Sequence, residues 1–162
     1  MTTTPSITVE SSGVWIFQAS IKNYKFLDAL RTGKNTIAWR VTRFGNYIRK
    51  GDTVLFWMSG PSAGIYAVGS VASDPAVMDP DPWEEVKNYY TTEYARECPD
   101  VLTPSVRALV TYSKKMIDDP LLKDDLKHHP TLKNLSVIKQ PQGTNFKVTT
   151  EQWLALKKLL YS

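Results

Sequence analysis

The side chains whose type and spacing point most clearly to a chemistry are three tryptophans of the first half of the chain, Trp15, Trp39 and Trp57. Each lies in or beside an apolar run with the length of a β-strand, and lysines and arginines surround these runs. Large aromatic rings bind flat apolar faces, and excess positive charge attracts phosphates. The combination suits a flat ring tethered to a negative chain, and a nucleotide base on its phosphate backbone is such a ligand.

The charges are unevenly distributed along the 162 residues, whose formal net charge is +4. Residues 11–72 carry eight Lys and Arg against two Asp, whereas residues 73–100 carry eight Asp and Glu against two basic residues. A basic face beside an acidic one suits an anionic partner on one side only. The plainer alternative is that these charges only solvate the surface.

The elements that must position the tryptophans are short and mixed. We expect strands over 14–20, 36–41, 52–58, 65–72, 105–112 and 135–138, and helices over 23–31, 83–97, 120–129 and from Thr149 onward. Thr149 and Gln152 have the spacing of a capping box. The segments 43–50 and 74–82 are expected to be irregular. This order predicts an α+β fold, a small, curved, barrel-like and mostly antiparallel sheet with short helices packed around it. We expect a flexible N-terminal tail over 1–13 and a single domain over 14–162.

Composition excludes several classes of protein. No apolar run approaches the ~20 residues that a membrane-spanning helix needs, so no membrane partner is expected. Met1–Ser6 is polar and does not resemble a secretory signal, and the lone Cys98 suits a reducing compartment. These features predict a cytoplasmic protein.

Signals for catalysis are weak. The sequence contains no glycine-rich phosphate loop, and the adjacent His128 and His129 would point about 100° apart on a helix, which makes a poor metal pair. Asp100, Asp125 and Lys127 resemble the acidic-plus-lysine site of a metal-dependent nuclease. However, Asp125 and Lys127 lie in a helical pattern, whereas that site needs a strand. We therefore expect no enzyme activity, no metal site and no cofactor.

Several segments together carry a resemblance to a known family. In chain order they are the strand around Trp15, the strand around Trp39, Ile48–Asp52, Trp57–Gly60, Ala63–Val71, Pro130–Leu132, Pro141–Phe146 and Thr150–Trp153. These residues resemble the EVE domain, a branch of the PUA-like superfamily that also includes the YTH domains. The resemblance implies a PUA-like fold and the recognition of modified bases in nucleic acid.

The resemblance also implies site residues. By analogy with the YTH domains, which hold a methylated base in an aromatic cage, Trp39 and Trp57 are the candidate cage walls. The other candidates for the base pocket are Gln18, Ala19, Ser20 and Asn23 at the base edge, Ser59 and Gly60 at the rim, and Thr144 and Asn145 on the far side. The candidate phosphate contacts are Lys22, Lys25, Arg40, Arg43, Arg49 and Lys50. The family often has Lys-Ser-Glu-Pro-like residues where this chain has Gln18–Ile21, so the preferred base is left open.

Two hypotheses follow from the sequence, together with the nuclease. The first is a non-catalytic reader that holds a modified base of DNA or RNA, alone or as an adaptor for a partner effector enzyme. The second is a module that uses the same pocket for a nucleoside-like small molecule, or that docks a protein partner.

Overall fold

The computed structural model describes residues 13–32, 34–79, 89, 91–97 and 103–161. The strands are β1 (Val14–Ala19), β2 (Thr36–Arg40), β3 (Thr53–Met58), β4 (Gly64–Val71), β5 (Ala76–Met78), β6 (Ser105–Lys115), β7 (Leu121–Leu122) and β8 (Asn145–Lys147). The helices are α2 (Phe26–Thr32), α4 (Thr92–Glu97), α5 (Lys123–Leu126), the 3-10 turn η2 (Leu132–Asn134), α6 (Ser136–Lys139) and α7 (Thr150–Leu160). Residues 1–12 of the expected tail lie outside the described residues.

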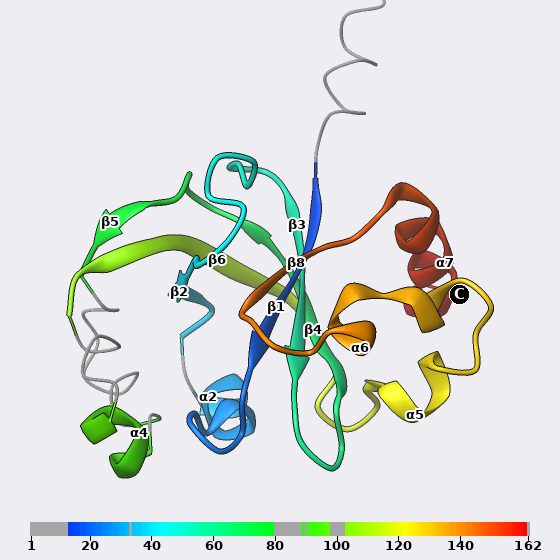
Figure 1. The fold of residues 1–162 in the computed structure, drawn as a ribbon, viewed down its shortest axis with the longest axis horizontal. Coiled ribbons are helices and arrows are strands. Elements are labelled where there is room, and N and C mark those ends of the chain that lie inside the picture. The colour runs from blue at the N-terminus through cyan, green and yellow to red at the C-terminus, as the bar shows by residue number, and fades with distance from the viewer. Residues whose placement is uncertain (1–12, 33, 80–88, 90, 98–102, 162) are drawn as a thin grey trace, which may run out of the picture.

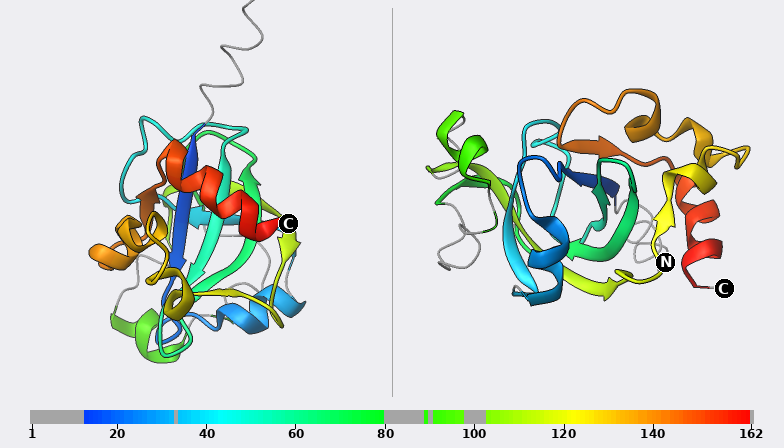
Figure 2. Two further views of the ribbon diagram at one scale, coloured as in Figure 1. Left: turned by 90° about the vertical axis from the view of Figure 1, so that its right-hand side faces the viewer. Right: turned by 90° about the horizontal axis from the view of Figure 1, so that it is seen from below.

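One sheet organises the molecule, in the order β2-β6-β4-β3-β1-β8. The β1–β3 pair is parallel and the other pairs are antiparallel, as the prediction of a mostly antiparallel sheet requires. The sheet curls into a half-barrel, with α2 at its lower end and α5, α6 and α7 on the outside (Figures 1 and 2). This arrangement confirms the predicted α+β, PUA-like fold class.

Alternation along β1 and β3 sorts the apolar side chains into two clusters. Trp15 and Phe17 point into the curl of the sheet, whereas Ile16 points outward. On β3, Phe56 points inward and Trp57 outward. The inner cluster is completed by α2, and the outer cluster by the helices that follow β6. The sheet is therefore covered on both faces, which is why β1 and β3 are almost continuously apolar.

The barrel end at which β1 begins is fastened by a buried carboxylate. Asp52 is 4% exposed and accepts hydrogen bonds from the Gly13 amide, the Trp15 indole Nε1 and the Arg49 amide, each at 2.9 Å. Gly13, the last residue of the expected tail, is thus attached to the domain. The predicted capping box of Thr149 and Gln152 is present at the start of α7.

Three sequence expectations are corrected. Residues 135–138 were predicted as a strand but contribute to α6, because a four-residue apolar run does not distinguish a strand from a helical turn. The predicted helix over 120–129 is shorter, since Leu121 and Leu122 pair with β4 before α5 begins. The segment 74–82 was expected to be irregular, yet Ala76–Met78 forms β5 against β6. Of the helix expected over 83–97, residues 92–97 are helical, and most of the remainder lies outside the described residues.

Candidate functional site

The candidate site lies where the curled sheet fails to close on itself. β2 is one edge of the sheet and β8 is the other. At one point a side chain joins the two edges: Asn145 of β8 accepts from the Thr42 amide at 2.8 Å and donates to the Arg40 carbonyl at 3.2 Å. Asn145 is fully buried. We call the gap between β2 and the β1/β8 edge the seam, and Asn145 closes one part of it.

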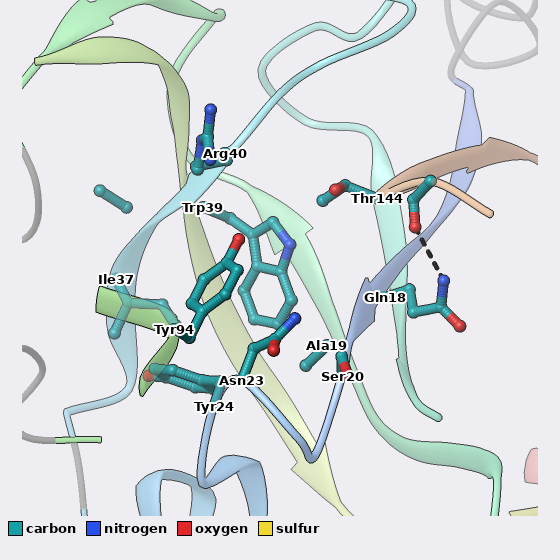
Figure 3. A pocket seen from close by; sticks show the side chains of 12 residues that line it. Gln18, Ala19, Ser20, Asn23, Tyr24, Ile37, Trp39, Arg40, Tyr94 and Thr144 are labelled. Atoms are coloured by element: carbon teal, nitrogen blue, oxygen red, sulfur yellow. Dashed lines mark hydrogen bonds between the residues drawn. The ribbon is translucent and has the colours of Figure 1, made fainter. Parts of the chain in front are cut away.

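The open part of the seam is a pocket of about 250 Å³. Its lining comes from the end of β1, the turn before α2, the strand β2, the helix α4 and the loop before β8 (Figure 3). The lining residues are Gln18, Ala19, Ser20, Asn23, Tyr24, Ile37, Ala38, Trp39, Arg40, Tyr94, Gly143 and Thr144. The volume lies just below the range of about 300–1,000 Å³ that is usual for drug-sized ligands, so the pocket suits a single flat ring.

Trp39 is the main aromatic wall. Its indole is 8% exposed and is held by three phenylalanines of the inner cluster, with ring centroids 6.2 Å from Phe17, 6.1 Å from Phe26 and 5.3 Å from Phe56. These contacts fix the ring before any ligand arrives. Tyr94 of α4 lies beside the Trp39 indole in the pocket (Figure 3).

Two backbone hydrogen bonds fasten the segment that carries Tyr94 to the turn before α2. The Thr91 amide donates to the Asn23 carbonyl at 2.8 Å, and the Lys25 amide donates to the Tyr89 carbonyl at 2.7 Å. The acidic segment of the sequence therefore reaches the pocket and contributes an aromatic ring to it.

The polar groups of the pocket are of two kinds. The Gln18 amide is committed, because its Nε2 donates to the Pro141 carbonyl at 2.8 Å and to the Gly143 carbonyl at 2.7 Å. Among the described residues, the side-chain amide of Asn23 and the Ser20 hydroxyl have no hydrogen-bond partner, although the Asn23 backbone amide donates to the Ser20 carbonyl at 3.0 Å. The Asn23 amide points toward the Trp39 indole (Figure 3). Asn23 and Ser20 are thus the groups available to the edge of a ligand.

The predicted phosphate contacts fall into two groups. Arg40 lines the pocket, and the side chains of Lys22 and Lys25 are exposed on the adjacent turn. The other three belong to the loop between β2 and β3. There Arg43 and Lys50 are exposed, whereas the Arg49 guanidinium donates to three backbone carbonyls of its own loop.

The family model named EVE domain matches residues 13–159, which is nearly the whole chain. The chain belongs to the EVE domain family. The match confirms the family predicted from the sequence. No curated protein matches the chain.

The EVE fold is shared with solved structures of low sequence identity. The chain is similar to human THYN1 in complex with DNA that contains 5-methylcytosine (16% identity, TM-score 0.65, 93% of this chain and 99% of that chain covered). It is also similar to a hypothetical protein from Leishmania major (20% identity, TM-score 0.62, 93% and 95% covered). A third similar structure is Rpa0253 from Rhodopseudomonas palustris (17% identity, TM-score 0.61, 93% and 95% covered).

Within this EVE domain, the structure removes four predicted residues from the pocket. Trp57 is 2% exposed and packs in the outer cluster, on the opposite face of the sheet from Trp39. Ser59 and Gly60 form the turn after β3 and do not line the pocket; a Cβ at Gly60 would meet Ile21 at 2.8 Å. Asn145 bridges the seam instead of facing the pocket.

The structure retains Gln18, Ala19, Ser20, Asn23, Trp39 and Thr144 as pocket residues. Sequence reasoning missed Tyr24, Ile37, Ala38, Tyr94 and Gly143, and it placed Arg40 only among the phosphate contacts. Ile37 and Ala38 could have been inferred from their position beside Trp39 on one strand. Nothing in the sequence signalled Tyr94, because the helix expected over 83–97 carried no indication of the part of the sheet against which it packs.

The described residues offer no alternative site for metal chemistry. Among them, no group of three or more His, Cys, Asp or Glu side chains could hold a metal ion. Asp125 lies on α5, and Lys127 follows α5 and pairs with Asp124 at 3.3 Å, so neither has the strand geometry of a nuclease site. Asp100 lies outside the described residues. No helix in the described part of the chain has the length and apolar character to cross a bilayer.

Proposed function

We propose that this EVE domain is a non-catalytic reader that holds a modified, methylated base of a nucleic acid in the seam pocket. One observation carries the proposal: Trp39, immobilised by three phenylalanines, shares a ring-sized pocket with the uncommitted Asn23 amide and Ser20 hydroxyl. The bound THYN1 structure supports it, because that protein has the same fold and holds DNA containing 5-methylcytosine. No cofactor or metal is needed for such binding.

The energetics of the pocket are adequate for this role. A base that leaves a stack loses a few kcal/mol, and stacking on an aromatic ring returns roughly 1–3 kcal/mol. The Trp39 ring is held in place by its neighbours, so little side-chain entropy is lost when a base binds. An additional methyl group in an apolar pocket is worth about 1–3 kcal/mol. We therefore expect preferences of roughly tenfold to a hundredfold for a methylated base over its unmodified form.

The base edge is assigned to Asn23 and Ser20. An amide presents a donor and an acceptor side by side, which matches the paired donor and acceptor on the hydrogen-bonding edge of a base. Arg40 at the pocket, with Lys22 and Lys25 on the adjacent turn, would contact phosphates and make the affinity sensitive to salt. The domain would act alone or deliver a partner effector enzyme to the modified strand.

The test is a titration with matched oligonucleotides, as DNA and as RNA, that contain cytosine, 5-methylcytosine, 5-hydroxymethylcytosine, adenine or N6-methyladenine. Binding is measured by fluorescence anisotropy at two salt concentrations. A preference for one modified base that weakens with salt is the expected result. Equal affinity for all strands, or capture of the free nucleoside with no dependence on salt, would overturn the proposal and favour a small-molecule module.

The variant for this test is Asn23→Ala, because Asn23 is half-buried at the rim and lies outside both apolar clusters. We expect this variant to reduce the preference for the modified base while the domain stays folded. Asn134→Ala makes the same change at an exposed position of η2, remote from the pocket, and should leave binding unchanged. An unchanged preference in Asn23→Ala would contradict the assignment of the base edge.

A further inference from the structure

The loop between β2 and β3, residues 41–52, is held far more firmly than an exposed connection requires. The Arg49 guanidinium donates to the Gly45 carbonyl at 3.2 Å, the Ile48 carbonyl at 2.8 Å and the Asn46 carbonyl at 2.8 Å. The Ile48 side chain is fully buried in the inner cluster. An arginine whose guanidinium donates to several carbonyls of its own loop holds that loop in one conformation.

The same loop contains backbone strain. Phe44 has a φ of 63°, and within the described part of the chain it is the one residue other than glycine with a positive φ. A bulky side chain in this region is a genuine outlier that persists only where the surroundings enforce it. Here the Phe44 ring packs 5.2 Å from the Trp15 ring, and the Arg43 guanidinium lies 4.9 Å above the Phe44 ring. The loop is thus held in an energetically unfavourable backbone conformation, a feature that is common at functional sites.

This fixed loop exposes an aromatic ring and two basic side chains. Tyr47 is 72% exposed, although its backbone amide is bonded to the Phe44 carbonyl at 2.9 Å. The side chains of Arg43 and Lys50 are exposed on the same loop. Proteins that bind single strands combine such stacking rings with positive charge, because every base has an aromatic face and every nucleotide a phosphate.

We propose that Tyr47 is a stacking platform for a second base of the strand whose modified base enters the seam pocket. This inference rests on the proposed function. The partner surface it defines is the loop 41–52, with Tyr47 under the base and Arg43 and Lys50 beside the phosphates.

The loop directly follows the strand that lines the pocket. Arg40 lines the pocket, and two residues further on the Thr42 amide is held by Asn145, the side chain that closes the seam. Tyr47 follows Arg40 by seven residues, so their Cα atoms are at most about 25 Å apart. At 3.4 Å per nucleotide along one strand, a strand anchored in the pocket reaches Tyr47 within about seven nucleotides. The loop lies beside the start of β1 (Figure 1).

The experiment compares strands of two lengths. The long probes are single-stranded DNA of about 20 nucleotides with cytosine or 5-methylcytosine at the centre, and the short probe is a trinucleotide with 5-methylcytosine, all at low salt. We expect Tyr47→Ala to weaken both long probes by the same factor, roughly five- to a hundredfold, and to leave the trinucleotide unchanged. Tyr47→Phe keeps the ring and should retain the affinity of the wild type.

The matched control is Tyr161→Ala, which removes another exposed tyrosine (59%, against 72% for Tyr47) with a lysine over its ring, just after α7 on the outer face. It should not change binding. Full affinity of Tyr47→Ala for the long probes would overturn the inference, as would equal losses for long and short probes or no binding of long probes by the wild type. Wild-type binding without preference for 5-methylcytosine would count against that base in the pocket, while the effect of Tyr47→Ala would still decide the stacking platform.

Discussion

Trp39 and Trp57 occupy two regions that differ in what surrounds a nearly buried indole. Trp57 is enclosed by the outer cluster, where helices α5, α6 and α7 cover the sheet. Trp39 has phenylalanines on its inner side and the open part of the seam on the other. Both indoles are nearly buried, with exposed fractions of 8% for Trp39 and 2% for Trp57. The comparison teaches that burial alone does not separate a core ring from a ligand-binding ring; the presence of a cavity with uncommitted polar groups does.

The largest expected effect separates the two tryptophans by stability. Trp57→Ala should lower the free energy of unfolding by about 3–5 kcal/mol, because it leaves a sealed cavity in the outer cluster. Trp39→Ala should cost about 1–2 kcal/mol less, since part of the ring already faces a cavity. Urea denaturation measures both. Below the unfolding transition, Trp57→Ala should still bind the modified strand, whereas Trp39→Ala should not. A greater loss of stability in Trp39→Ala than in Trp57→Ala, or loss of binding in Trp57→Ala but not in Trp39→Ala, would contradict the assignment of Trp39 as the ligand-binding wall.

The next effect concerns the closed part of the seam. Asn145→Leu keeps the approximate volume but leaves the Thr42 amide and the Arg40 carbonyl without their partner. An unsatisfied polar group costs about 1–3 kcal/mol when it is buried; both of these bonds are part-buried, so we expect a loss of about 1–2 kcal/mol in urea denaturation. Faster amide hydrogen exchange at Thr42 is the local signature. Unchanged exchange at Thr42 would show that the edges of the sheet are held by something other than Asn145.

The smallest effect tests the loop that forms one wall of the pocket. Gln18→Glu is nearly isosteric but cannot donate to the Pro141 and Gly143 carbonyls. A net hydrogen bond contributes about 0.5–1.5 kcal/mol, so stability should fall by about 1 kcal/mol and affinity by roughly two- to tenfold. Gln18→Lys restores donors and should recover part of the affinity. Gln142→Glu, at an exposed neighbouring position, is the charge-matched control. Equal losses in Gln18→Glu and Gln142→Glu would indicate repulsion of the strand rather than a displaced loop.

The sequence predicted what depends on local pattern. The strands at Trp15, Trp39 and Trp57 are present, because apolar runs or alternation between turn residues determine them locally. The prediction that Trp39 and Trp57 form two walls of one pocket was wrong, because local pattern does not show which face of the sheet each indole occupies. Which face of a strand points into a curled sheet depends on the curl itself, and the register of β3 on β4 shifts between Phe56 and Trp57.

The residues that the sequence misplaced are those whose role depends on distant contacts. Asn145 looked like a polar residue of a binding loop, yet its partners are more than a hundred positions earlier in the chain. Tyr94 gave no signal because backbone bonds to Asn23 and Lys25, not a motif, bring its segment to the pocket. Gln18 lines the pocket, as expected, but its side-chain amide donates to the loop before β8 and is not free for the edge of a base.

The incomplete closure of the sheet has a consequence for the order of folding events. The pocket is lined by residues between 18 and 40, by Tyr94, and by Gly143 and Thr144, so its lining is complete only when the last strand has docked. A ligand that spans this gap binds the closed sheet and not a form in which β8 has detached. By mass action it would stabilise the closed form by about 2.7 kcal/mol at a hundred times its dissociation constant. A bound ligand would therefore stabilise, reversibly, the association of the N-terminal strands with the C-terminal part of the chain.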